Sequence, residues 1–173
     1  TVGEVWRTIG LLGLLIAAIE MNAFKDRYQP QVIANARAFA RALKACGLDV
    51  QGDPTRGYTE THQVVLKVGY ARGPEVAREL EASQIICNYQ ALPEDEGFTA
   101  SSGLRLGVSE MTRFGMLETD FEALAQVMAE VILKKRPMAE EVSRLRSAFQ
   151  ELDFCFKGDE IRAYQEQFLE SLR

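Results

Sequence analysis

The chain has 173 residues, of which 47% are hydrophobic and 26% are charged, and its formal net charge is −5. This length suits one domain, and the hydrophobic content is sufficient for a buried core. No basic stripe is present that could replace the counterions of a phosphate backbone, so the composition argues against a nucleic-acid-binding protein.

Three further features of the sequence argue against a disulfide framework, a histidine-based metal site and a membrane span. Cys46, Cys87 and Cys155 lie far apart without a C-x-x-C spacing, which is typical of reduced thiols in a cytoplasmic protein. His62 is the only histidine, so we expect no metal site built on imidazole ligands. The apolar run 9–19 is only half of the ~20 residues that a membrane span requires, and we expect no membrane segment.

Two helices are predicted before the first strand. Residues 4–26 are apolar on most sides, which indicates a helix that packs against something outside this chain. A second helix is predicted to begin near Pro30, because proline suits the first turn of a helix. Its apolar residues lie on one stripe, and Gly47 ends it.

Short strands and one short helix follow. Strands are predicted at 48–50, 62–68, 85–88 and 103–108, with a helix that begins at Gly73 and an irregular loop at 91–100. In the second strand Val64, Leu66 and Val68 alternate with Gln63, Val65 and Lys67. A period of two is typical of a sheet with one face covered.

Three further helices are predicted toward the C-terminus. Thr119-x-x-Glu122 is interpreted as a capping box, and the helix that it opens runs to 134–136 before Pro137. The next two helices are marked by apolar residues, at Met138, Val142, Leu145, Phe149 and Leu152, and at Ile161, Tyr164, Phe168 and Leu172. The predicted fold is α/β, of the α+β small-domain kind: a small, mostly antiparallel sheet of three or four strands with helices packed on it, and long helices at both ends.

Arg105 is the candidate binding residue. In a strand Leu104 and Leu106 face one side and Arg105 the other, while Gly103 and Gly107 leave room for a ligand. A guanidinium group matches a carboxylate through two parallel hydrogen bonds. The alternative is an exposed strand arginine, or one paired with a glutamate, and spacing alone favours that alternative because charged residues mostly lie on surfaces.

Two other features have simpler interpretations. His62 is a candidate general base, but a single histidine beside a strand is more often a hydrogen-bonded structural residue. The acidic segment 93-PEDEG-97 lacks the ladder of carboxylates that a calcium loop needs, so we interpret it as a solvated loop.

Four segments in order resemble one enzyme family. From about residue 14 to 133 the sequence is similar to the C-terminal small domain of serine (glycine) hydroxymethyltransferase, a pyridoxal-phosphate enzyme of the aspartate-aminotransferase fold type (fold type I), and the style is that of archaeal members. The segments are 28-YQPQVIANARAFARAL-43, 59-TETHQVVLKV-68, 85-IICNYQALP-93 and 101-SSGLRLG-107.

The resemblance implies roles for several residues. Arg105 corresponds to the residue that binds the substrate carboxylate of serine or glycine. Asn88, Gln90 and Ser102 are possible contacts of the co-substrate, tetrahydrofolate or a related pterin. Gln90 stands where members that use folate usually have asparagine, which leaves the one-carbon acceptor open.

The resemblance also implies a division of the chain and a missing part. Residues 1–27 correspond to a helix between domains, 28–136 to the small domain and 137–173 to a helical C-terminal extension. The Schiff-base lysine of the family follows a Thr-Thr-Thr-His-Lys run in the large domain, and no lysine here has that context. We therefore expect no catalytic residue in this chain, no activity of the chain alone, and two partners: a large domain that binds pyridoxal phosphate, on the same or a separate polypeptide, and a second copy in a homodimer.

Three functions stay open from the sequence. The first is the small domain of a hydroxymethyltransferase-like enzyme. The second is an aldolase or transaldolase of the same fold that acts on β-hydroxy amino acids without folate. The third is a free-standing module that senses a small amino acid; it predicts that this chain alone binds serine or glycine tightly.

Overall fold

The structure of the chain, a computed structural model, describes residues 2–160, 162–163, 166 and 170. It divides into two compact units, Thr1–Tyr28 with Asp153–Arg173, and Gln29–Leu152. The residues that mark the predicted terminal helix, Ile161, Tyr164, Phe168 and Leu172, lie outside the described residues.

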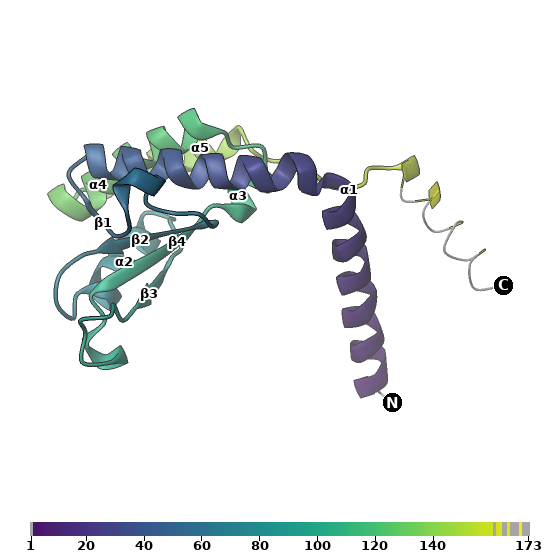
Figure 1. Cartoon of the computed structure of the whole chain (residues 1–173), viewed down its shortest axis with the longest axis horizontal. Helices are drawn as coiled ribbons and strands as arrows, with labels where there is room; N and C mark the ends of the chain where they lie inside the picture. The colour runs from purple at the N-terminus through teal and green to yellow at the C-terminus, as the bar shows by residue number, and fades with distance from the viewer. Residues whose placement is uncertain (1, 161, 164–165, 167–169, 171–173) are drawn as a thin grey trace. The chain divides into compact units, whose positions relative to one another are not determined.

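The first helix is longer than the sequence suggests. α1 (Val2–Ala45) continues through Pro30, so the prediction of a second helix that begins there is wrong (Figure 1). Proline in a helix interior removes one backbone hydrogen bond, but the neighbouring turns on both sides remain helical. The boundary between the two units lies beside this proline, between Tyr28 and Gln29.

In the first unit, α1 has an exposed apolar surface and one set of aromatic contacts. The Phe24 and Phe156 rings lie 5.5 Å apart, and those of Tyr28 and Phe154 lie 5.3 Å apart. The large apolar side chains that stay exposed are Leu11, Leu14, Leu15, Ile16 and Met21. Within the first unit this surface therefore stays uncovered. Among the described helices, none combines the length and the hydrophobicity that a membrane span requires.

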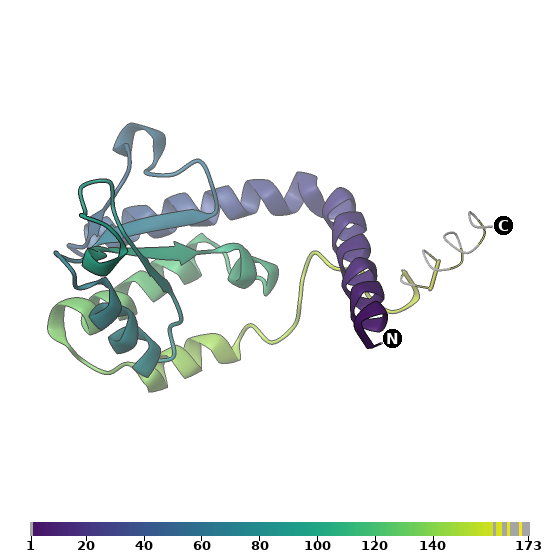
Figure 2. The same cartoon turned by 90° about the horizontal axis from the view of Figure 1, so that it is seen from below.

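The second unit contains a four-stranded sheet in the order β1-β2-β4-β3, in which every pair is antiparallel. Its strands are β1 (Asp49–Val50), β2 (Gln63–Lys67), β3 (Asn88–Gln90) and β4 (Gly103–Gly107). β2 and β4 run side by side in Figure 2. The predicted fold class, a small antiparallel sheet with helices packed on it, is confirmed.

One strand is displaced from its predicted position. The strand predicted at 85–88 is observed at Asn88–Gln90. Gln84 has a left-handed φ of 65°, and the Ile85 N–H donates to the Leu80 carbonyl at 2.9 Å. The chain just before β3 therefore completes the helix-ending turn, and pairing with β4 starts only at Asn88.

Four helices accompany the sheet: α2 (Gly73–Ala82), α3 (Ser109–Arg113), α4 (Glu118–Lys134) and α5 (Ala139–Ser147). The predicted capping box at Thr119 and Glu122 is wrong, since α4 begins at Glu118 and the Asp120 carboxylate accepts from the Leu117 N–H at 2.8 Å. α5 is shorter than predicted, because Phe149 and Leu152 follow its end. Two short 3-10 turns, Pro54–Arg56 and Phe98–Ala100, complete the unit.

The core lies between one face of the sheet and the helices. Val64, Leu66, Leu104 and Leu106 are buried on this face, and the rings of Phe39 in α1 and Phe121 in α4 lie 5.4 Å apart. Burying such a side chain contributes about 1.5–3 kcal/mol. A buried amide joins α1 to α3: the Asn35 side chain donates to Thr112 Oγ1 at 2.9 Å and to the Met116 carbonyl at 2.8 Å.

Candidate functional site

The candidate site is the face of the sheet opposite the core, which we call the open face. It carries the alternate residues of the strands: Gln63, Val65 and Lys67 of β2, Asn88 and Gln90 of β3, and Gly103, Arg105 and Gly107 of β4. This assignment follows from the burial of Leu104 and Leu106, because successive side chains of a strand point to opposite faces.

Arg105 lies at the centre of the open face. It pairs with Val65 on one side and with Asn88 on the other, and directly opposite residues have Cβ atoms about 4.5–5.5 Å apart. Arg105 is exposed, and within the part of the chain that the structure describes it has no hydrogen bond or ion pair. The structure therefore agrees with the alternative of an exposed strand arginine, whereas the alternative of an arginine already paired with a glutamate does not hold for the described residues.

The two glycines beside Arg105 are not equivalent. A Cβ added at Gly107 would meet nothing within 4 Å, so this side of Arg105 is open. A Cβ added at Gly103 would lie 2.7 Å from Cδ2 of Leu92 and 3.0 Å from the Gln90 carbonyl oxygen. The expectation that both glycines leave room for a ligand is therefore correct only for Gly107, since the space at Gly103 is filled by Leu92.

The loop that carries Leu92 is held by Asp95. The Asp95 carboxylate accepts from Ser102 Oγ at 2.6 Å and from the N–H groups of Ser102 and Leu92, both at 2.8 Å. The Ser102 hydroxyl, followed by the Leu92 N–H, holds the pKa of Asp95 below its ordinary value. The acidic segment is thus more than a solvated loop, because one of its carboxylates closes the 92–102 loop onto the start of β4.

The possible pterin contacts divide into two kinds. Asn88 is exposed and Gln90 is half-buried, both on the open face. Ser102 is buried, and its hydroxyl is already bonded to Asp95. Gln90 also lines a depression of about 480 Å³ beside Arg105's strand, together with Tyr58, Thr59 and Glu94.

His62 lies just before β2 and is exposed. Its carbonyl oxygen accepts from the Val108 N–H at 3.1 Å, which extends the pairing of β2 with β4 by one bond. Its side chain forms no hydrogen bond within the described residues. No group of three His, Cys, Asp or Glu side chains in the same part of the chain is arranged to hold a metal ion.

Three of the lysines are held in ion pairs with glutamates. Lys67, the lysine of the open face, is bonded to Glu94 Oε1 at 2.5 Å. Lys134 is paired with Glu130, and Lys135 with Glu79. A lysine that forms a covalent bond with an aldehyde must lose its proton, and Glu94 instead raises the pKa of Lys67.

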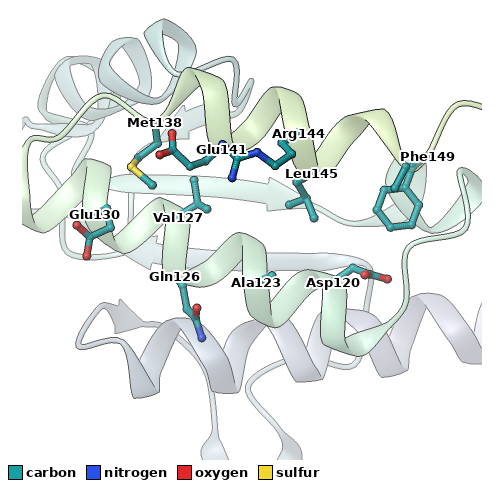
Figure 3. A pocket seen from close by; sticks show the side chains of 11 residues that line it. Asp120, Ala123, Gln126, Val127, Glu130, Met138, Glu141, Arg144, Leu145 and Phe149 are labelled. Atoms are coloured by element: carbon teal, nitrogen blue, oxygen red, sulfur yellow. The ribbon is translucent and has the colours of Figure 1, made fainter.

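A groove of about 570 Å³ lies away from the open face, between α4 and α5. Val127 of α4 and Leu145 of α5 form its apolar part, with Glu130, Glu141 and Arg144 among its charged lining residues (Figure 3). None of the predicted site residues lines it, so it is separate from the candidate site.

The geometry of the open face suits the binding of a small anion more than covalent chemistry. Arg105 offers a rigid set of N–H donors, with an amide group, Asn88, opposite it and free space at Gly107. The sequence singled out Arg105 but predicted neither its pairing with Asn88 nor the Asp95 clamp. The signal available for the clamp was an aspartate followed seven positions later by a serine, a pattern too common to be recognised in isolation.

Comparisons with known proteins point to one enzyme family. The sequence profile of the family described as serine hydroxymethyltransferase matches residues 5–128. The chain is 41% identical over 160 residues to a serine hydroxymethyltransferase of Archaeoglobus fulgidus and 40% identical over 153 residues to one of Staphylothermus marinus. These alignments cover 89% and 85% of this chain, but only 36% and 35% of the relatives, so the chain spans about a third of their length.

A solved structure is also similar. The crystal structure of an L-threonine transaldolase from Pseudomonas fluorescens matches with a TM-score of 0.76 and 34% sequence identity, over 88% of this chain and 36% of that one. The profile covers more than half of the chain, in agreement with the order of the four motifs and with the antiparallel sheet. The chain therefore belongs to the serine hydroxymethyltransferase family and represents a C-terminal portion of this fold type.

Proposed function

We propose that this chain supplies the carboxylate-binding half of the active site of a serine hydroxymethyltransferase-type enzyme. The observation that carries the proposal is the unpaired guanidinium of Arg105 at the centre of an otherwise uncharged row, Val65–Arg105–Asn88. An arginine without an acidic neighbour is available for an acid that arrives with the substrate.

In the proposed enzyme, Arg105 binds the carboxylate of serine or glycine through two parallel N–H···O bonds. When both carboxylate oxygens are held, the amino acid cannot rotate freely within the site. The bond of its Cα that is to be broken is therefore kept in one direction. Asn88 lies directly opposite Arg105 and can donate a further hydrogen bond to the bound molecule or to a pterin.

The rest of the active site would come from a large domain that holds pyridoxal phosphate, on the same polypeptide or on a separate one, and we propose that the complete enzyme is a homodimer. The exposed apolar residues of α1, among them Leu14 and Ile16, support a covering partner because so much apolar surface on one helix is unfavourable in water. The proposal includes inactivity of this chain alone and the division into 1–27, 28–136 and 137–173.

The complete enzyme provides the test. Arg105→Ala should lower kcat/KM for serine roughly a hundredfold or more, because the substrate carboxylate loses charged hydrogen bonds in a closed site. Lys67→Ala is the matched control: it removes a cation from the same face, but one already paired with Glu94, and should change kcat/KM by no more than about threefold. Equal effects of the two substitutions would refute the role of Arg105.

A second function is favoured by one observation. The similarity to an L-threonine transaldolase leaves open an enzyme of the same fold that transfers or releases an aldehyde without a pterin. Serine turnover by the complete enzyme, measured with and without tetrahydrofolate, separates the two: a hydroxymethyltransferase requires the pterin, and a transaldolase requires an aldehyde acceptor instead. Arg105 has the same role in both.

A further inference from the structure

A cavity of about 330 Å³ lies on the covered side of the sheet, within the unit Gln29–Leu152. Its walls are mainly apolar and come from β4, α3, α4 and the segment before β3, with Leu106, Met111, Met116, Phe121 and Met128 among them. This volume is within the range of about 300–1,000 Å³ that is usual for small-molecule sites. Gly107 lines this cavity as well as belonging to the open face, but Arg105 does not line it.

One guanidinium group lines this cavity. Arg146 of α5 lies with its guanidinium carbon 4.3 Å from the centre of the Phe114 ring, and its Nη1 is buried with no hydrogen-bond partner in the described part of the chain. A buried donor without an acceptor is costly, and for a charged group the cost is larger. A guanidinium stacked on an aromatic ring still offers its N–H edge to an acceptor in its own plane.

The other polar residues that line the cavity are Gln84 and Glu110. Both are exposed, and Glu110 forms no ion pair with Arg146. The carboxylate of Glu110 is therefore hydrated, whereas Nη1 of Arg146 is not. Nη1 of Arg146 thus has no acceptor within the described residues, and the other walls of the cavity are mainly apolar.

We propose that this cavity binds a small carboxylate with an apolar chain, its acid group on Arg146 and its chain among the methionines. Volume, lining and the unsatisfied donor all point to this class of ligand. The site is independent of Arg105 and of the proposed reaction, so it stands or fails separately from the proposed function.

The five methionines of the chain make a direct test possible. Met111, Met116 and Met128 line the cavity, Met138 lines the groove between α4 and α5, and Met21 belongs to the other unit. The full chain, labelled with ¹³C at the methionine methyl groups, is titrated with hexanoate. We expect saturable shifts at the three cavity methionines and none at Met21 or Met138. Shifts spread over all five, or shifts that do not saturate, would overturn the proposal.

The role of the charge is tested in two ways. Hexan-1-ol, which keeps the apolar chain but lacks the acid group, should bind about tenfold more weakly than hexanoate or worse. Arg146→Gln should weaken hexanoate by a similar factor, whereas Arg144→Gln, an exposed arginine on the same helix, should leave it unchanged. If Arg146→Gln fails to fold, the affinities of the wild type for hexanoate and for hexan-1-ol still test whether the acid group contributes to binding. Equal affinity for the two would contradict the proposal.

Discussion

The two faces of the sheet differ in almost every physical respect, although the same strands form both. On the covered face Leu104 and Leu106 are buried, at 0% and 5% exposure. On the open face the residue between them, Arg105, is exposed and has no partner among the described residues. β4 therefore contributes to the core through one side and, in the proposed function, to substrate binding through the other.

This difference separates two kinds of sensitivity to substitution. Changes on the covered face should alter the free energy of unfolding, because they remove packed apolar volume. Changes at the exposed positions of the open face, such as Arg105 and Gly107, should leave that free energy almost unchanged and act on binding in the complete enzyme. Substitutions at neighbouring positions measure whether effects on the free energy of unfolding and effects on binding are separate.

Adjacent positions in β4 give the largest expected contrast. Leu104→Ala should lower the free energy of unfolding by about 2–5 kcal/mol, because it leaves a cavity in the core. Arg105→Ala should change it by only about 0.5 kcal/mol or less, since an exposed, unpaired side chain is removed. Urea unfolding of the full chain measures both. A loss for Arg105→Ala comparable with that for Leu104→Ala would mean that Arg105 has a structural role.

The buried amide of Asn35 tests whether the covered side depends on polar contacts as well as apolar ones. Asn35→Ala removes the donors to Thr112 Oγ1 and to the Met116 carbonyl, and it should lower the free energy of unfolding by roughly 2–3 kcal/mol because an acceptor remains buried and unpaired. Thr119→Ala, an exposed change in the first turn of α4, is the control. Equal stability of both variants would contradict this account.

The two glycines of the open face sharpen the comparison. Gly103→Ala should cost about 1–3 kcal/mol, because the new methyl group would collide with Leu92 and the Gln90 carbonyl. Gly107→Ala has free space and should change the free energy of unfolding by about 0.5 kcal/mol or less. Thermal unfolding of the two variants distinguishes them. A larger loss of stability for Gly107→Ala than for Gly103→Ala would contradict the free space at Gly107.

Asp95 should give the smallest effect and a characteristic pH dependence. Its pKa is lower in the folded chain than its ordinary value of 3.8, so its charge stabilises the fold above that value. As the pH falls below 3.8 and through the lower folded pKa, this contribution is lost. Asp95→Asn should therefore melt below the wild type at pH 7, and the difference should shrink as the pH falls below 3.8. A difference independent of pH would exclude the carboxylate as its source.

Much of the covered face could be predicted from the sequence. Alternation in 62–68 located β2 and its buried Val64 and Leu66, and the 103–108 pattern located β4. Other features could not be predicted. Helix α1 continues through Pro30, since proline removes only one backbone hydrogen bond of the helix. β3 starts only at Asn88, because the residues before it complete the turn that ends α2.

The open face was predicted in part. The alternation of residues predicted that Arg105 points to one face of the sheet and Leu104 and Leu106 to the other. It gave no information on which side chain packs against Gly103 or on which hydroxyl group Asp95 would bind. Both depend on how the 92–102 loop returns to the sheet. Such contacts join residues through loop geometry, which has no periodic signal in the sequence.

The central claim is that the guanidinium of Arg105 binds the substrate carboxylate. A double-mutant cycle in the complete enzyme tests it: kcat/KM is measured for serine and for serinamide, which lacks the acid group, with the wild type and with Arg105→Ala. The account predicts that the substitution greatly impairs the reaction of serine but barely affects serinamide, with a coupling energy of about 2–3 kcal/mol. Equal losses for the two substrates, and hence a coupling energy near zero, would contradict the account.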